Sequence, residues 1–341
     1  MTLILNQRQV RELLPMATCM DLVADGLARL SRDEAVNPLR KGIRVPASDG
    51  GGGDPPGFSG LLGLMPGFIG TPPALGLKVV GVFHGNHGTN LDSHQGIVAL
   101  FDTETGTPLV IMEGSEVTGI RTAAASGVAT RLLARVDASE LALIGSGVQA
   151  RTHLEAMIEA RPISKVRVYS RSAENREAFA ARESSKYGIP VVAVHSARAA
   201  VEGADIVCTV TSSSDPVVEG NWIAPGAHVN AAGSSVKDAR ELDTEAVRRS
   251  RLFVDRREST LHEAGDFLIP KAEGVIGEEH ILGEIGELVD GRIEGRCSAQ
   301  EVTLFKSLGV AVEDLVSAHH VLAQARARGI GVEVDLMGVR D

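Results

Sequence analysis

The chain has 341 residues, more than one average core holds, which predicts two domains or one discontinuous pair. Apolar residues make up 43% and charged residues 23%, and these ordinary proportions exclude a disordered or fibrous protein. The net charge is -10, and no stretch concentrates Lys and Arg, so a nucleic acid is not an expected partner.

The first third of the chain is expected to form helices and then a mainly antiparallel sheet. Apolar residues recur at helical spacing over residues 8–30, which predicts one or two amphipathic helices. Extended stretches follow at residues 42–45, 60–64, 77–83, 96–102 and 108–113. Between the first two stretches, the Gly and Pro density of SDGGGGDPPG, residues 48–57, predicts a mobile hairpin tip.

The pattern changes after residue 113. Residues 119–135 are rich in Ala and Leu and are expected to be helical, and strands and helices alternate from there on. Strands are predicted at residues 141–145, 166–171, 191–194, 206–211, 229–233 and 252–255, with helices to residues 161 and 187 between the first three. This alternation predicts a parallel sheet with helices on both faces. Residues 298–328 show a long helical pattern that is expected to return and cover the first domain.

A glycine-rich turn, LALIGSGVQA, connects a predicted strand directly to a predicted helix. Its Gly145, Gly147 and Ala150 stand in a G-x-G-x-x-A arrangement, in which the first residue permits the tight turn, the second lets a pyrophosphate approach, and the third brings helix and strand together. The helix N-terminus supplies N–H groups and partial positive charge. The turn therefore predicts a dinucleotide site in a Rossmann domain.

The end of the next strand decides between the two nicotinamide dinucleotides. An acidic residue there would accept hydrogen bonds from the ribose 2′-OH, but this sequence has Tyr169, Ser170, Arg171 and Ser172. A guanidinium and two hydroxyls suit a 2′-phosphate, which favours NADP(H) and leaves NAD(H) open. The alternative interpretation is that Arg171 is a solvated strand-end charge.

Four motifs in the same order resemble the ornithine cyclodeaminase and mu-crystallin family: TGIRTAAASGVA at residues 118–129, GSGVQA, VNAAGS and TLFKSLGVAVED. The similarity runs from about Asn37 to Asp314. It implies a homodimer and chemistry at an imine or amine carbon next to a carboxylate. The expected fold is α/β: a Rossmann doubly wound parallel sheet over residues 121–311, and a smaller mixed α+β substrate and dimerisation domain from residues 1–120 with 312–341.

The resemblance also implies a set of site residues. The cations for the substrate carboxylate fall on Arg40, Lys78 and Arg121, and Glu263 falls near bound ligand. Our hypothesis for the proton donor is Lys78 or a neighbouring histidine. Guanidinium groups suit a carboxylate because they bind it through two parallel hydrogen bonds. The implied cofactor residues are Ser93, His94, Arg121, Thr122, Gly145, Ser146, Gly147, Val148, Gln149, Ser170, Arg171, Ser172, Asn175, Thr211, Ser212, Ala232 and Ser307.

The sequence departs from the cyclodeaminases at two positions. They carry a glutamate and an aspartate where Gly63 and Ser235 stand here, and without those carboxylates the elimination of ammonia is not expected. Ser235 and Arg171 resemble the mu-crystallin branch, whose members reduce cyclic ketimines with NADPH. The sequence thus favours an NAD(P)H-dependent reductase of imino acids or an amino-acid dehydrogenase. A cyclodeaminase and a non-catalytic NADPH-dependent ligand binder stay open as alternatives.

Other features predict few additional partners. His84, His87 and His94 have no nearby carboxylate or thiolate cluster, so a pocket lining or proton relay is favoured over a metal site. No apolar run reaches membrane-spanning length, and no targeting segment is expected. Cys19, Cys208 and Cys297 match no redox or metal spacing, so each is expected to be a buried small hydrophobe in a reducing cytoplasm.

Overall fold

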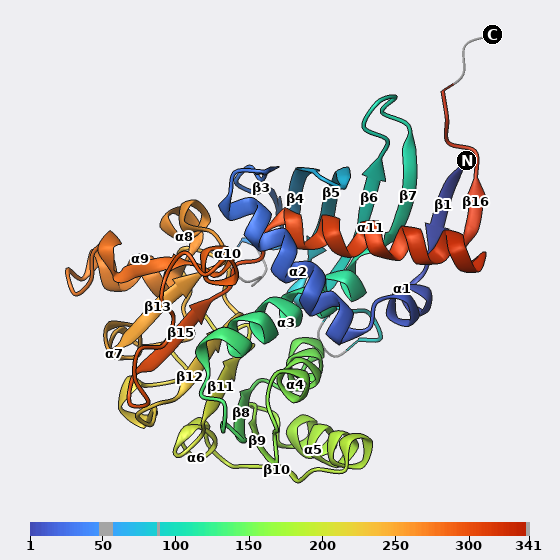
Figure 1. Ribbon diagram of the computed structural model, residues 1–341. Helices are drawn as coiled ribbons and strands as arrows, with labels where there is room; N and C mark the ends of the chain where they lie inside the picture. The colour runs from blue at the N-terminus through green and yellow to red at the C-terminus, as the bar shows by residue number, and fades with distance from the viewer. Residues whose placement is uncertain (48–56, 87–88, 339–341) are drawn as a thin grey trace. The chain divides into compact units, whose positions relative to one another are not determined.

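The computed structural model describes residues 1–47, 57–86 and 89–338 (Figure 1). The chain divides into two compact units: unit 1 is Met1–Arg121 with Val310–Asp341, and unit 2 is Thr122–Gly309. The long helix α3 (Gly114–Leu133) runs across the first division. In the described part of the chain, no helix has the length and hydropathy needed to cross a membrane.

Unit 1 begins with a short strand and two helices, β1 (Thr2–Leu5), α1 (Gln7–Leu13) and α2 (Met16–Ser31). The Asn6 side chain caps α1 by accepting the Gln9 N–H at 3.1 Å. Apolar residues three and four apart, among them Val23 and Leu27, form the buried side of α2. This confirms the amphipathic helices predicted over residues 8–30.

Unit 1 also contains one sheet, in which β1 is joined by β2 (Ala35–Val36), β3 (Lys41–Pro46), β4 (Phe58–Gly70), β5 (Pro73–Val82), β6 (His94–Phe101), β7 (Pro108–Glu113) and β16 (Val332–Val334). The strand order is β16-β1-β7-β6-β5-β4-β2, with β3 also paired to β4. Among the described strands of this sheet, only β1 and β7 pair in parallel, so the expected mainly antiparallel sheet is confirmed. The segment SDGGGGDPPG lies outside the described residues, apart from its last glycine.

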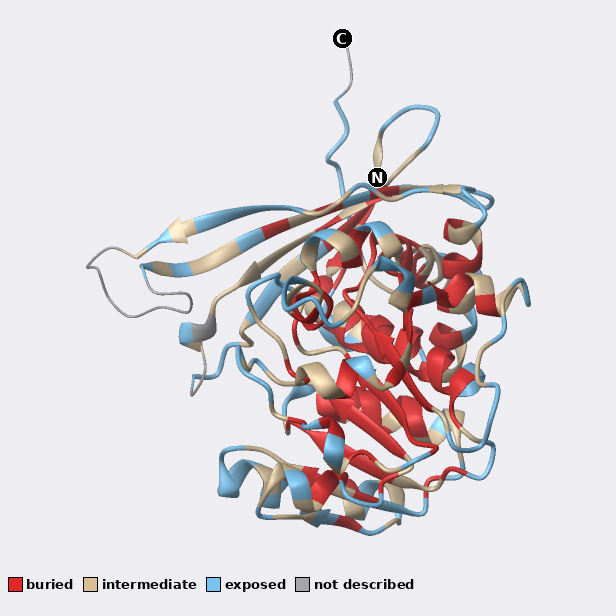
Figure 2. Ribbon diagram, turned by 90° about the vertical axis from the view of Figure 1, so that its left-hand side faces the viewer, coloured by how far each residue is buried: buried red, intermediate tan, exposed pale blue. Residues whose placement is uncertain are grey.

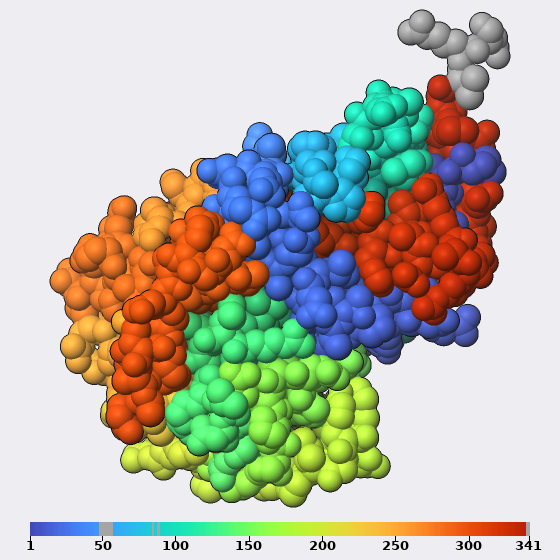
Figure 3. Space-filling model, in the orientation of Figure 1, coloured from blue at the N-terminus to red at the C-terminus, as the bar shows by residue number. Residues whose placement is uncertain are grey.

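One face of this sheet is covered by helix α11 (Ala311–Arg328), which packs on β4, β5, β6 and α2. Met65, Lys78 and Val98 are register partners on three adjacent strands, and all three are buried on that covered face. Segments from the two ends of the sequence thus lie side by side in unit 1, as the blue and red surfaces of Figure 3 show.

Unit 2 contains a fully parallel sheet of β8 (Glu140–Ile144), β9 (Lys165–Tyr169), β10 (Val191–Ala193), β11 (Ile206–Thr209), β12 (His228–Ala231), β13 (Ser250–Val254), β14 (Ile281–Glu284) and β15 (Val302–Lys306). The order is β10-β9-β8-β11-β12-β15-β13-β14, so the chain reverses direction across the sheet between β8 and β11. That order is typical of a doubly wound α/β sheet and confirms the expected fold class.

The helices of unit 2 follow the strands in the sequence: α4 (Val148–Ala160), α5 (Ala173–Tyr187), α6 (Ala197–Val201), α7 (Thr244–Arg248), α8 (Arg257–Glu263), α9 (Gly265–Ala272) and α10 (Ile285–Val289). Strand β8 is buried from Leu141 to Ile144, and β11 is buried along its whole length. Figure 2 draws buried residues in red, and several strands have this colour. A sheet buried on both faces provides rigid strand ends for the loops that follow.

Two sequence-based expectations are wrong. Residues 298–328 do not form one helix, because Val302–Lys306 is the central strand β15 and α11 begins only at Ala311. A short apolar run buried on both sides has no alternation that separates strand from helix. Cys297 is exposed, whereas Cys19 and Cys208 are fully buried, and burial raises the pKa of each of these two thiols to about 12.

Candidate functional site

The turn between β8 and α4 has the backbone that a pyrophosphate site needs. Gly145 has φ +125°, and a Cβ there would lie 2.7 Å from the Val210 carbonyl oxygen. A Cβ on Gly147 would meet no atom of the described chain within 4 Å, so open space lies beside the start of α4. Gly147 is the N-cap of α4, and no side chain caps the helix. Backbone donors at this helix end therefore fit a phosphate.

Polar side chains connect this turn to the end of β9. The Ser146 hydroxyl donates to Ser170 Oγ at 2.9 Å. Ser172 caps α5 by accepting the Asn175 N–H at 3.1 Å. Arg171 is exposed and pairs with no carboxylate in the described part of the chain. The predicted residues Ser146, Ser170, Arg171, Ser172 and Asn175 thus surround one strand end.

Gln149 and Ser307 each bury a polar atom without a partner. Among the described residues, Gln149 Oε1 and Ser307 Oγ have no hydrogen bond although both are shielded from water. An unpaired buried polar group is costly, so a bound polar ligand is a reasonable partner for each. The two atoms support the assignment of Gln149 and Ser307 to a cofactor site.

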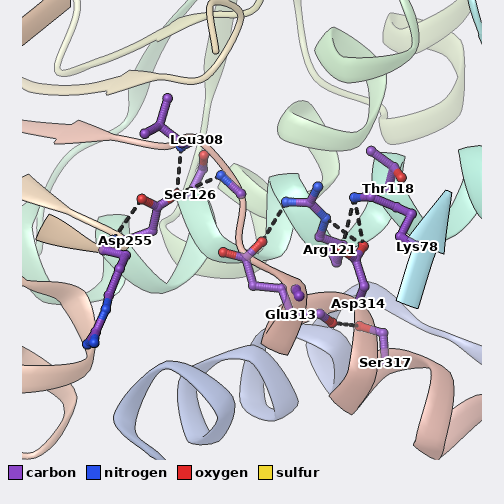
Figure 4. Close-up of polar contacts among 12 residues, drawn as sticks. Lys78, Thr118, Arg121, Ser126, Asp255, Leu308, Glu313, Asp314 and Ser317 are labelled. Atoms are coloured by element: carbon purple, nitrogen blue, oxygen red, sulfur yellow. Dashed lines mark hydrogen bonds and ion pairs between the residues drawn. The ribbon is translucent and has the colours of Figure 1, made fainter. Parts of the chain in front are cut away.

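Asp255 fixes the chain directly after Ser307. Its Oδ2 accepts the N–H groups of Leu308 at 2.6 Å and Gly309 at 2.7 Å (Figure 4). Asp255 is itself buried at the end of β13. Two charge-assisted hydrogen bonds to one carboxylate oxygen hold the backbone beside Ser307 in one conformation.

The loops after β11 and β12 are joined by Glu241, a buried residue that the sequence did not single out. Its Oε1 accepts the Thr211 N–H at 2.6 Å and the Thr211 hydroxyl at 2.7 Å. Its Oε2 accepts the Thr209 hydroxyl and the Gly233 N–H, both at 2.8 Å. Glu241 therefore orders the two loops that carry the predicted cofactor residues Thr211, Ser212 and Ala232.

Unit 1 contains four buried charges in one cluster (Figure 4). Lys78 Nζ on β5 donates to Asp314 Oδ1 at 3.0 Å and lies 2.9 Å from Asp314 Oδ2. Arg121 Nε on α3 donates to the same Asp314 Oδ1 at 3.0 Å, and its Nη1 donates to Glu313 Oε2 at 2.6 Å. The structure thus brings together two of the three predicted cations, and places beside them two carboxylates that sequence reasoning missed.

Burial changes the proton affinity of this cluster. The pKa of Lys78 is lowered to about 8, because burial disfavours the ammonium and Arg121 repels it, while Asp314 opposes the change. A lysine with this pKa can both hold and release a proton near neutral pH. Lys78 is therefore equipped to transfer a proton to a group bound beside it.

The other predicted residues lie outside this cluster. Arg40 precedes β3 and is half-buried, three residues after Asn37, whose Oδ1 accepts the first N–H of α11 at 2.7 Å. Ser93 and His94, at the start of β6, form a side-chain hydrogen bond of 3.1 Å. Thr122 is buried in α3.

Glu263 ends α8 in unit 2 and is partly buried. No group of three His, Cys, Asp or Glu side chains in the described ranges could hold a metal ion, and His87 lies outside those ranges.

Comparison with known proteins identifies relatives over nearly the whole chain. A family model described as the ornithine cyclodeaminase/mu-crystallin family matches residues 1–329. Ketimine reductase mu-crystallin of Mus musculus is 41% identical over 259 residues, which are 76% of this chain and 79% of that protein.

Two solved structures share the fold. The Thermococcus litoralis Δ¹-pyrroline-2-carboxylate reductase, in complex with NADH and L-proline, aligns with a TM-score of 0.92 and 40% identity, over 98% of this chain and all of that one. An archaeal alanine dehydrogenase dimer with bound NAD aligns with a TM-score of 0.89 and 30% identity, over 98% and 99% of the two chains.

Proposed function

Because this chain belongs to the ornithine cyclodeaminase/mu-crystallin family, we propose that it is an NAD(P)H-dependent reductase of the C=N bond in a small imino acid. The observation that carries this proposal is the buried Lys78 beside Arg121, in a chain that also has a complete dinucleotide turn. Two similar proteins are named for reductases of this kind, a ketimine reductase and a pyrroline-2-carboxylate reductase.

The charges of unit 1 suit a substrate carboxylate. Lys78 and Arg121 balance Glu313 and Asp314, so the four charges sum to zero, and a carboxylate bound beside them needs one further cation. Arg40 is the residue that we assign to this task, together with Arg121, whose orientation Glu313 and Asp314 fix in advance. A cation held in place beforehand loses little side-chain entropy when the substrate binds.

The reaction divides between the cofactor and the chain. Bound NAD(P)H supplies a hydride to the imine carbon. Lys78 holds the proton that the imine nitrogen takes up, and Asp314 keeps the Lys78 ammonium in one position. Gly63 and Ser235 replace the two carboxylates that serve the elimination of ammonia in the cyclodeaminases, so the proposal is reduction rather than cyclodeamination.

We propose NADP(H) as the preferred cofactor. Arg171 is exposed at the end of β9, and Ser170 and Ser172 lie next to it, a set of donors that suits a 2′-phosphate. An acidic residue at this strand end would repel that phosphate, and the sequence has none there.

A homodimer is the assembly that we propose. The face of the unit 1 sheet that points away from α11 carries apolar residues, and Leu62, Leu75 and Ile97 on three adjacent strands are 36%, 38% and 42% exposed. A continuous apolar face of this kind is typical of a subunit interface. The alanine dehydrogenase with the same fold is described as a dimer.

A reducing cytoplasm is the compartment that we propose, because Cys19, Cys208 and Cys297 of this chain are free thiols.

The test is a substrate panel. Purified protein is mixed with NADPH or NADH and with pyrroline and piperideine carboxylates, iminosuccinate, or pyruvate plus ammonia or methylamine, while the absorbance of the reduced cofactor is followed. We expect oxidation of NADPH by at least one cyclic imino acid. Tight NADPH binding without turnover on any acceptor would contradict the proposal and favour a ligand binder. Release of ammonia from ornithine without net cofactor change would favour a cyclodeaminase.

A further inference from the structure

Three buried charged residues form a connected network in unit 2. Lys306, the last residue of β15, lies with its Nζ 2.8 Å from Asp266 Oδ2 and donates to the Ser234 carbonyl at 2.6 Å. Asp266 Oδ1 in turn accepts the N–H groups of Glu241 at 2.9 Å and of Leu242 at 3.0 Å. Lys306, Asp266 and Glu241 are each at most 2% exposed, so water screens none of them.

The backbone donors around Glu241 favour its carboxylate form. All four of its partners, the Thr209 and Thr211 hydroxyls and the Thr211 and Gly233 N–H groups, donate to it. The two N–H groups can only donate, one to each oxygen, so the carboxylate satisfies both of them as well as the two hydroxyls. Burial and the nearby Asp266 raise the pKa of Glu241, and Lys306 and the donors oppose that rise. With Glu241 ionised, the three charges sum to −1.

Sheet topology places this net charge on one side of the dinucleotide crevice. The phosphate-binding turn follows β8, and the adenosine-ribose position follows β9, both on one side of the reversal in strand order. A dinucleotide crosses a doubly wound sheet at this reversal, so its second half falls to the loops after β11 and β12. Those loops are the segments that Glu241 and Lys306 hold.

We propose that the Glu241–Asp266–Lys306 network sets the relative affinity of the site for the oxidised and reduced dinucleotide. The inference rests on the proposed function. The nicotinamide ring carries a positive charge when oxidised and none when reduced. A fixed negative charge nearby therefore stabilises the oxidised form, and its effect is stronger in a buried site than in water. The reduced cofactor then gives up its hydride, with the electron pair, more readily to the imine carbon.

The experiment measures dissociation constants for NADP+ and NADPH without substrate, by fluorescence titration and calorimetry. Two variants each bring the network charge to zero, Glu241→Gln and Asp266→Asn. In both we expect the ratio of the NADP+ constant to the NADPH constant to rise roughly 3- to 30-fold. The double variant Asp266→Asn/Lys306→Met keeps a net charge of −1, and its ratio should return to the wild-type value.

The double variant separates electrostatics from a structural role, because a loosened site would weaken both cofactor forms in parallel. Glu245→Gln is the matched control: it removes one negative charge at an exposed residue that pairs with Arg248 at 2.7 Å, and the ratio should not change. Circular dichroism checks the fold of each variant. If either Glu241→Gln or Asp266→Asn fails to fold, the other one still tests the effect of a neutral network.

Two negative results have different meanings. The electrostatic inference alone would be overturned if folded single variants bound both cofactor forms with the wild-type ratio of dissociation constants. It would also be overturned if the double variant had the same raised ratio as Asp266→Asn. Failure of the wild-type protein to bind either form would contradict the proposed function itself.

Discussion

Lys78 is an ammonium group placed where water is almost excluded, and it shares the Asp314 carboxylate with the Arg121 guanidinium. Its pKa of about 8 gives a testable pH dependence. Reduction needs the protonated amine, so kcat/KM for imine reduction should fall as pH rises through about 8. Oxidation of the amino acid needs the neutral amine and should rise through the same range. Rate profiles in both directions measure this.

Variants assign the pH dependence to this residue. Lys78→Met should lower kcat/KM about 10²- to 10⁴-fold, as the loss of a general acid does. Asp314→Asn removes a group that raises the Lys78 pKa, so the break in the profile should move to lower pH. Asp25→Asn, on the exposed surface of α2, should leave the profile in place. A profile that stays unchanged in Asp314→Asn would argue against Lys78 as the proton donor.

Arg171 tests the cofactor preference. Arg171→Asp replaces a donor for the 2′-phosphate with a carboxylate that can accept from a ribose 2′-OH. The specificity ratio, kcat/KM with NADPH over kcat/KM with NADH, should fall about 10- to 100-fold, which is the contribution of a hydrogen bond to a charged group. Arg198→Asp makes the same charge change on the exposed surface of α6 and should not alter the ratio. Equal losses with both cofactors would point to a structural role for Arg171.

At the scale of one element, two glycine variants before α4 distinguish an effect on protein stability from an effect on cofactor binding. Gly147→Ala adds a methyl group in open space, so its free energy of unfolding should fall by about 1 kcal/mol or less, while the dissociation constant for NADPH rises about 10-fold. Gly145→Ala meets the Val210 carbonyl and a positive φ, so it should destabilise the unliganded protein by about 1–3 kcal/mol. Denaturant unfolding and fluorescence titration measure the two quantities, and equal binding by wild type and Gly147→Ala would refute the assignment.

Elements whose signals are local could be predicted from sequence. The strand, turn and helix around Gly145 need only neighbouring residues. The predicted strand, residues 141–145, and the predicted helix end, residue 161, each differ from the observed bounds by one residue. Strand β15 could not be predicted, because its apolar run has no periodicity of its own and becomes a strand by pairing with β12 and β13. Strands β1 and β16 pair Thr2–Leu5 with Val332–Val334, and no local pattern marks partners so distant in sequence.

The candidate site could be predicted where its residues stand in short, recognisable motifs, and not where they depend on distant contacts. Cations and glycines have recognisable roles in short motifs, and the family resemblance supplied Arg40, Lys78 and Arg121 together. Asp314 and Glu313 stand in the first turn of α11, where acidic residues are common for helix stability alone. Their pairing with Lys78 and Arg121 depends on a fold that joins residues far apart in the chain. Glu241 was missed for the same reason.

At the scale of the whole molecule, the dimer proposal makes a direct prediction. The double variant Leu62→Asp/Ile97→Asp places four carboxylates across a two-fold interface, so it should sediment as a monomer where the wild-type protein sediments at twice the chain mass. Val136→Asp, at an 85% exposed residue of unit 2, is the control and should remain dimeric. A wild-type protein of single-chain mass at all concentrations would contradict the dimer.

The division of the chain also bears on how the protein folds during synthesis. The ribosome makes strands β1–β7 of unit 1 first, then all of residues 122–309, and only afterwards Asp314, the carboxylate that neutralises Lys78, and strand β16. Arg121 and Glu313, paired at 2.6 Å, lie at the two ends of that long insertion. Closing so long a flexible loop has an entropic cost, which falls once unit 2 has folded and shortened the distance to be searched. Unit 2 is therefore expected to fold before unit 1 is complete. Its folding shortens the search by which α11 reaches the sheet of unit 1.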